Sequence, residues 1–375
     1  MKRIAMAAAT LALASVGTGT ATAEPWSRGY VVEWIEAAAY FGGKGGITGP
    51  GTDCPKGTTE FDLKRLLTTS YRPAEEVAKI LNPDKPESKG LFPAMHMRGP
   101  NKEDVYKEPK SVPDPGMREV QGKIAYGFDL DGNPNTGFTS PTGQRGIDNQ
   151  FYKAWGCWEA FRGPTRSPGA TYHNDEMRNG KFTVAMLISG NSDPRNDEDV
   201  TLGIFTSKDK LVKDAKGDIA PDYSFRIANE PRYTSLLKAR IVDGVLELKE
   251  PQDIKMREAS FLATLTLYGG RVRIEMPEEG PIHGMVGGYK PIQEAFTTWT
   301  IAGPNVELVT HVDLSAAYYA LERNADARPD PENGANTAVS TALHFWAVPA
   351  FVIHPKAGEG AQAVSAGGST AGGGR

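Results

Sequence analysis

Four oxygen-bearing side chains fall at every second position of one short loop, at Asp129, Asp131, Asn133 and Asn135. Calcium takes roughly six to eight oxygen ligands, and closely spaced carboxylate and amide groups on a turning backbone can supply several of them. Asp148 follows the glycines of the same loop and could add another carboxylate. The spacing therefore predicts a calcium site that includes Asp129, Asp131, Asn133 and Asp148.

The start of this loop has the D-x-D-x-N order seen in calcium-binding loops. The remainder differs from an EF-hand, because Pro134 replaces the glycine of the sixth position and Ser140 replaces the glutamate of the twelfth. The D-x-D-x-N stretch resembles the short calcium loops of dockerin and thrombospondin type 3 repeats, and this resemblance implies calcium as the ligand. The alternative is a loop of Asx turns, in which these side chains bond to their own backbone.

A second acidic segment, residues 191–199, reads N-S-D-P-R-N-D-E-D. Asp193 and Asp197 could form another cation site, or they could complete the first site if the two loops meet. The alternative is a solvated hairpin loop, since runs of charged residues usually face water. Both aspartates are therefore candidate metal ligands.

Histidine and methionine occur together in three places, at 95–97, at His173 with Met177, and at His283 with Met285. Imidazole and thioether groups are borderline and soft ligands that suit copper. The three places are scattered along the chain, and no cysteine completes a cupredoxin-like His-Cys-Met order. A periplasmic copper-binding protein is therefore a minor alternative.

The sequence contains neither a G-x-S-x-G nor an H-E-x-x-H motif, which mark serine hydrolases and zinc proteases. Residues 172–176 form the densest group of titratable side chains, with His173 beside two carboxylates. A histidine and a carboxylate could carry out acid–base chemistry. A secreted hydrolase with such a pair in the loops near Asp129, Asp148 and His173 is the main alternative to a non-enzymatic protein.

Aromatic residues with helical spacing follow the acidic loop, at Phe151, Trp155, Trp158 and Phe161. Asp148 or Asn149 stands where a helix N-cap is expected. An aromatic face of this kind could stack on sugar rings, but aromatic residues at helical spacing are more often part of a core. The pattern therefore predicts a buried helix.

The first 23 residues have the three parts of a secretory signal peptide. Lys2 and Arg3 are followed by the short apolar segment 4–16 and by the small residues of 21–23, where cleavage is expected. The apolar segment is too short to span a bilayer, and no later stretch is apolar enough to do so. The sequence therefore predicts export to the periplasm or the medium, and no transmembrane segment.

Net charge and cysteine content add two further expectations for the exported chain. Removing Lys2 and Arg3 with the signal peptide lowers the formal charge from −4 to −6, so the chain lacks the basic footprint of a nucleic-acid-binding protein. The only cysteines are Cys54 and Cys157. Disulfides persist in exported proteins, and an even number of cysteines predicts a Cys54–Cys157 bridge.

The elements that must position these groups are mainly β-strands. Residues 24–120 suggest a helical and extended elaboration, residues 121–355 a β core with one late helix at 313–323, and residues 356–375 a disordered tail. Asp243-Gly244 and Gly269-Gly270 stand between alternating segments and predict two tight hairpins. The expected strands of the core are 122–130, 182–189, 200–206, 238–242, 245–249, 261–268, 271–276 and 296–301.

Short strands with such turns predict an antiparallel β-sandwich, jelly-roll-like, with a few peripheral helices. The resulting hypothesis is an exported, calcium-stabilised protein that binds a carbohydrate, a small molecule or a protein partner. The sequence leaves open whether it is an enzyme.

Overall fold

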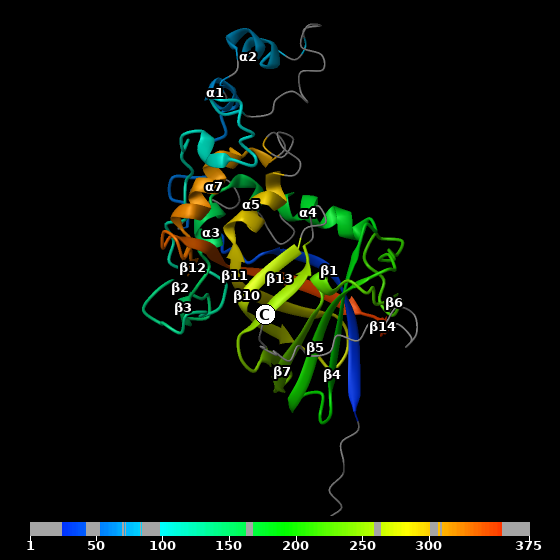
Figure 1. Cartoon of the computed structure of the whole chain (residues 1–375). Helices are drawn as coiled ribbons and strands as arrows, with labels where there is room; N and C mark the ends of the chain where they lie inside the picture. Colours follow the sequence, from blue (N-terminus) through cyan, green and yellow to red (C-terminus); the bar gives the residue numbers. More distant parts are fainter. Residues whose placement is uncertain are drawn as a thin grey trace, which may run out of the picture.

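The computed structural model describes residues 25–42, 53–69, 71, 73–82, 84, 98–162, 168–258, 264–300, 307 and 310–354. The fold is mainly β, but the expected β-sandwich is wrong, because the main sheet closes on itself as an eight-strand antiparallel barrel (Figure 1). The barrel strands are β1 (Trp26–Ala37), β4 (Thr183–Gly190), β5 (Asp197–Ser207), β7 (Ser235–Val242), β8 (Val245–Leu248), β10 (Thr264–Glu275), β11 (Ile282–Pro291) and β13 (Asn336–Pro349).

Strand β1 closes the barrel. From β4 to β13 each barrel strand pairs with the next one along the chain, which would leave β4 and β13 as open edges. β1 fills this gap, because its residues Trp26–Val31 pair with β4 and its residues Tyr30–Ala37 pair with β13. Closure removes unpaired edges, which a sandwich would keep. Residues 24–120 therefore contribute a strand to the barrel itself, besides peripheral elements.

Alternating side chains fill the barrel interior. In β7 every second residue from Ser235 is buried and the residues between are exposed. The inward side chains of the barrel strands belong to one hydrophobic cluster, which also includes Met177 of helix α4 (Pro168–Arg178). Eight-strand barrels are just wide enough for side chains to fill. Side chains therefore fill this barrel, and α4 lies over one end of it, where Met177 joins the core (Figure 1).

The glycine pair at Gly269-Gly270 is not a hairpin turn, as the sequence suggested, but lies inside β10. The register of β10 shifts at this point against both β9 (Gln252–Arg257) and β11. In a regular strand, residues five positions apart face opposite sides of the sheet. Leu267 and Val272 nevertheless both belong to the barrel core, so the bulge turns the alternate side chains of the second half of β10 inward. Glycine inside a strand often marks such a bulge. The second expected hairpin, at Asp243-Gly244, is confirmed by the pairing of β7 with β8.

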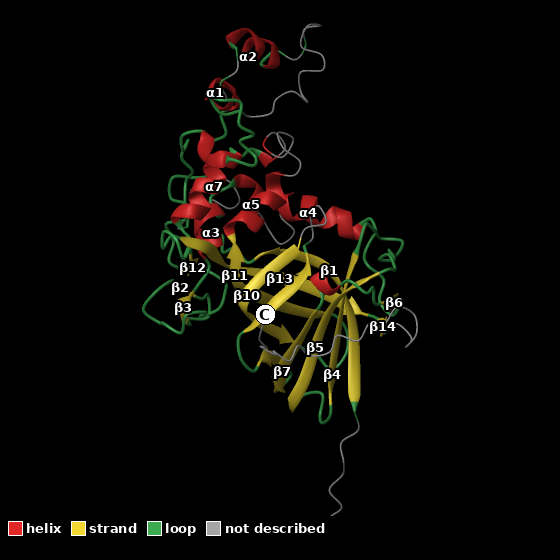
Figure 2. Cartoon of the chain, viewed as in Figure 1, coloured by secondary structure: helices red, strands yellow, loops and turns green. Residues whose placement is uncertain are grey.

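A second hydrophobic cluster joins most of the helices, which gather at one end of the barrel (Figure 2). It includes α3 (Gln150–Trp155), α5 (Ile292–Thr300) and α7 (Leu314–Arg323). The expected strand 296–301 is wrong, because its described residues belong to α5. The helix expected at 313–323 is confirmed, and its Asp313 side chain accepts a hydrogen bond from the Ala316 amide at 3.0 Å as an N-cap.

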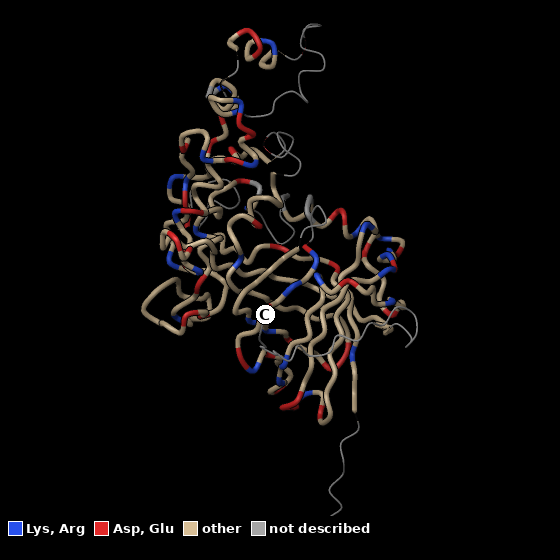
Figure 3. The backbone as a smooth tube through the Cα atoms, viewed as in Figure 1, with Lys and Arg blue, Asp and Glu red and all other residues tan. Residues whose placement is uncertain are grey.

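The remaining elements are short. The helices are α1 (Leu63–Thr69) and α2 (Ala74–Ile80), and single 3₁₀ turns occur at Pro109–Ser111, Glu159–Phe161 and Pro231–Tyr233. β12 (Ala327–Pro329) pairs with β13, and β6 (Ser224–Arg226) pairs with β14 (Phe351–Ile353). Acidic and basic residues are mixed along the described chain in the view of Figure 3.

The expected Cys54–Cys157 disulfide is present, and it joins segments 103 residues apart. It lies beside a buried ion pair, in which the Arg162 guanidinium contacts both carboxylate oxygens of Asp53 and donates to the Gly156 carbonyl at 2.9 Å. Arg162 and Asp53 are 0% and 1% exposed. The disulfide and the ion pair together fix the N-terminal segment against the end of α3.

Candidate metal centre

The acidic loop is brought into position by an antiparallel bridge between Phe128 and Asp148. The Asp148 amide donates to the Phe128 carbonyl at 2.8 Å. The chain between these residues forms the small hairpin of β2 (Phe138–Thr139) and β3 (Arg145–Ile147). Because the two ends of the loop lie side by side, Asp129 and Asp148 become neighbours although they are distant in sequence.

The loop packs on the barrel at Gly287 of β11. A Cβ atom at this position would lie 2.7 Å from Cδ2 of Phe128 and 2.9 Å from the Thr341 carbonyl oxygen. Such approaches are closer than van der Waals contact allows, so only glycine lets Phe128 sit against the sheet. The residue next to Phe128 is Asp129, and its carboxylate is therefore held at the barrel surface.

Three of the expected ligands come together. Carboxylate oxygens of Asp129, Asp131 and Asp148 all lie within 4.8 Å of one another. The side chain of Asp148 is buried, that of Asp129 is half-buried and that of Asp131 is exposed. Within the described part of the chain, Oδ1 of Asp129 is buried and has no hydrogen-bond partner. A buried carboxylate oxygen without a partner is costly, and a cation would satisfy it.

Hydrogen bonds within the loop shape this group. Oδ2 of Asp148 accepts from the Leu130 amide at 2.8 Å and from the Asp131 amide at 3.2 Å. Asp131 and Asn133 each accept from the amide two residues later, at 2.7 Å and 3.1 Å. Asx turns are thus present, and they position the carboxylates without engaging the buried oxygen of Asp129. The side-chain oxygen of Asn133 accepts one such bond and keeps a second lone pair.

The electrostatic environment of the group is strongly negative. The pKa of Asp148 is raised to about 6, chiefly by burial and also by the carboxylates of Asp131 and Asp326, against the lowering effect of the two amide hydrogen bonds. Burial also raises the pKa of Asp326 and that of Tyr289, and the nearby carboxylates add to both effects. Ser340 donates to Asp326 through its hydroxyl at 2.6 Å and its amide at 2.7 Å. Like charges at this density favour a bound cation.

The sequence reasoning missed Asp326 and Tyr289. Both come from the far C-terminal half of the barrel, Asp326 just before β12 and Tyr289 on β11. Neither belongs to an acidic motif, and each reaches the loop because β11, β12 and β13 are neighbours in the sheet. Asp326 thereby adds a carboxylate to the electrostatics of the site.

The second acidic segment does not join this group. Figure 1 places the turn between β4 and β5 at the opposite end of the barrel from the helices, away from β2 and β3. Oδ2 of Asp197 accepts from Trp26 and from the amides of Asn191 and Ser192. Burial raises the pKa of Asp197, but these bonds and one from the Asp199 amide outweigh it and leave that pKa lowered. Asp193 caps the turn through the Arg195 amide at 2.9 Å.

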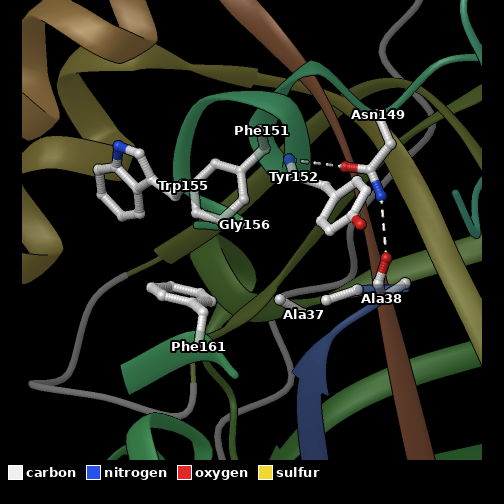
Figure 4. A pocket seen from close by; sticks show the side chains of 9 residues that line it. Ala37, Ala38, Asn149, Phe151, Tyr152, Trp155, Gly156 and Phe161 are labelled. Atoms are coloured by element: carbon white, nitrogen blue, oxygen red, sulfur yellow. Dashed lines mark hydrogen bonds between the residues drawn. The ribbon is translucent and has the colours of Figure 1, made fainter. Parts of the chain in front are cut away.

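The other sequence candidates are the histidine and methionine positions and the aromatic helix. Residues 95–97 and the side chain of His173 lie outside the described residues, and Met177 is fully buried in the barrel core. Trp155 and Trp158 are also fully buried, as expected for a core helix. The pocket beside α3 is lined by Asn149 and by aromatic rings, including that of Tyr152 (Figure 4). Its volume of about 10 Å³ leaves room for no more than one water molecule. It offers no platform for a sugar.

Compared with known protein families, characterised proteins and solved structures, the chain has no significant match. Among the helices that the structure describes, none combines the length and apolar character needed to cross a membrane.

Proposed function

We propose that this chain is an exported binding protein whose barrel is stabilised by calcium held at Asp129, Asp131 and Asp148. The observation that carries the proposal is the convergence of three carboxylates, with oxygens within 4.8 Å of one another, one of which, that of Asp129, also has a buried oxygen without a hydrogen-bond partner in the described chain. The disulfide supports an oxidising compartment. The expected signal peptide lies outside the described residues.

The donor set favours calcium over other metals. All the side-chain ligands are carboxylate oxygens, which hard cations prefer, whereas zinc and copper prefer nitrogen or sulfur. Backbone carbonyls and water can complete the remaining positions in a flexible loop. The ion would join the start of the loop at Asp129 to its end at Asp148, so its main effect is to hold the loop on the barrel.

A cation explains the cluster better than hydrolysis does. The two carboxyl groups of a glycosidase stand roughly 5–9.5 Å apart, with space for the substrate between them. Here three carboxylates rather than a pair converge, with oxygens within 4.8 Å of one another, which suits a shared ion. The hydrolase therefore stays an alternative without a particular observation in its favour.

A surface groove supports the binding role. It lies along β1 and β14, has a volume of about 630 Å³, and is lined by Arg28, Tyr30, Glu279 and Phe351 among others. Sites for small molecules commonly have volumes of roughly 300–1,000 Å³ and combine apolar walls with a few polar groups. The ring of Phe351 is 60% exposed, so the groove offers an apolar contact for a small-molecule, carbohydrate or protein partner.

The calcium site is tested by elemental analysis of the mature, oxidised protein, together with thermal melts with and without EDTA. We expect one calcium ion per chain, a lower melting temperature in EDTA, and recovery with calcium. D129A and D131A should lose the ion and the response to EDTA. D193A is the matched control and should retain both. A metal-free protein with an EDTA-insensitive melt, or equal loss in D193A, would refute the proposal.

A further inference from the structure

Two histidines from separate strands meet on the outer face of the barrel. His283 and Met285 lie on β11, and His344 and Trp346 lie on β13. In the antiparallel register Met285 is opposite His344, and His283 is opposite Trp346. Phe345, between the two β13 residues, belongs to the barrel core. Because side chains alternate along a strand, His344 and Trp346 point outward.

The distance between the two imidazoles is that of a metal-binding pair. Nε2 of His283 and Nδ1 of His344 are 3.2 Å apart, and the ring planes differ by 25°. Two nitrogens that bind one ion at about 2.0–2.1 Å in a tetrahedral arrangement lie about 3.3 Å apart. The nitrogens therefore need to move very little to share an ion.

The surroundings keep this pair suited to metal binding. The side chains of His283 and His344 are both half-buried. Trp346 stacks on His283 with ring centroids 4.9 Å apart, and the edge of Tyr126 meets His344 at 5.0 Å. These ring contacts pack against both imidazoles and hold them side by side.

We propose that His283 and His344 form a copper site, with the thioether of Met285 as the third ligand. Met285 faces His344 across the strand pair and is two residues from His283 on the same face, which places it beside both rings. Imidazole and thioether donors select copper over hard cations. Among the described residues, no third His, Cys, Asp or Glu joins the pair in a metal-binding group.

Binding requires a change of tautomer and a rotation of the two rings, so that the lone pairs of the facing nitrogens converge on the ion. One imidazole now donates the hydrogen bond that joins the pair. When copper binds, that ring keeps its proton on its other nitrogen, and both facing nitrogens donate lone pairs to the ion. No electron is transferred in this step. The site shares no ligand with the calcium site, and its donors are nitrogen and sulfur rather than carboxylate oxygen.

The test uses the mature, disulfide-bonded protein in calcium-containing buffer. One equivalent of Cu(II) is added, or of Cu(I) under anaerobic conditions, and loosely held metal is removed by desalting. Bound copper is measured by elemental analysis, Cu(II) coordination by electron paramagnetic resonance, and binding by tryptophan fluorescence, which Trp346 should report. The variants are H283N, H344N and M285L, with H354N as the matched control.

We expect one copper ion per chain and a fall in tryptophan emission on addition of Cu(II). H283N and H344N should each lose at least about tenfold in affinity, with unchanged calcium content and unchanged melting temperature without copper. M285L should weaken Cu(I) more than Cu(II), and H354N should behave as the parent. Parent-like copper binding by H283N or H344N would refute the site, and unchanged Cu(I) affinity in M285L would remove Met285 from it. Calcium content reports separately on the proposal for the acidic loop.

Discussion

Replacing Asp148 with asparagine should have opposite effects on stability with and without calcium. In the metal-free protein the pKa of Asp148 is about 6 instead of 3.8. A carboxyl group with a raised pKa holds its proton more strongly in the folded state, so the free energy of unfolding falls as the pH rises from about 4 to 6 and then stays reduced. At neutral pH the ionised Asp148 therefore destabilises the metal-free fold.

The size of this effect follows from the pKa. The difference between about 6 and 3.8, at about 1.4 kcal/mol per pKa unit, amounts to about 3 kcal/mol. Screening by solvent at the loop surface reduces the expected value to roughly 2 kcal/mol. Asparagine keeps an oxygen for the Leu130 and Asp131 amides but carries no charge. D148N should thus be roughly 2 kcal/mol more stable than the parent in EDTA at neutral pH.

Calcium should reverse the order. An ion that binds only the folded parent adds about 2.7 kcal/mol at a concentration one hundred times its dissociation constant, and D148N has one carboxylate fewer to bind it. The assay is urea unfolding of both proteins, in EDTA and in calcium, at pH 4 and at neutral pH. At pH 4 in EDTA the two curves should nearly coincide. A D148N protein less stable than the parent in EDTA at both pH values would refute the reasoning.

Three further predictions concern the packing around the site. R162A should lower the free energy of unfolding by about 3–5 kcal/mol, because it leaves the carboxylate of Asp53 buried without its partner. The double variant C54S/C157S should lose about 4.7 kcal/mol by the chain-entropy estimate for a loop of this length, measured by urea unfolding of the oxidised parent and the variant. G287A should displace Phe128 and weaken calcium binding, measured by isothermal titration, while the fold is retained by circular dichroism.

Each of these has its own control. R273A breaks an exposed ion pair with Glu247 and should cost less than about 1 kcal/mol; equal losses in R162A and R273A would contradict the importance of burial. For the disulfide, a variant as stable as the oxidised parent would contradict the prediction. For the glycine, G280A is the control, because a Cβ at Gly280 would meet nothing within 4 Å, although its positive φ adds a modest strain. Parent-like calcium affinity in G287A would show that the Phe128 contact does not position the site.

Much of the local structure could be predicted from the sequence, because it depends on short-range rules. Alternating apolar residues predicted strands, and Asp243-Gly244 predicted the β7–β8 hairpin. Asp313 predicted the N-cap of α7, which begins at the next residue. The disulfide followed from the cysteine count and the expected export. The alternation of aspartates in one loop also identified carboxylates that the structure brings together.

Other features depended on the tertiary structure. Alternation shows which face of a strand is buried, but a sandwich and a barrel bury the same face, so only the pairing of β1 with both β4 and β13 distinguishes them. Gly269-Gly270 fits both a turn and a bulge, and the strands on either side of β10 determine which one forms.

The same distinction holds for the two candidate metal sites. The sequence by itself determined part of the ligand chemistry: oxygen donors in one loop, and the imidazole and thioether donors of His283 and Met285, but not His344. Only the pairing of β11, β12 and β13 with one another decided that Asp326 joins the carboxylates and that His283 meets His344, which is 61 residues away in the chain. Pairing between strands is a long-range choice, since it depends on the register of whole strands rather than on the residues near each side chain.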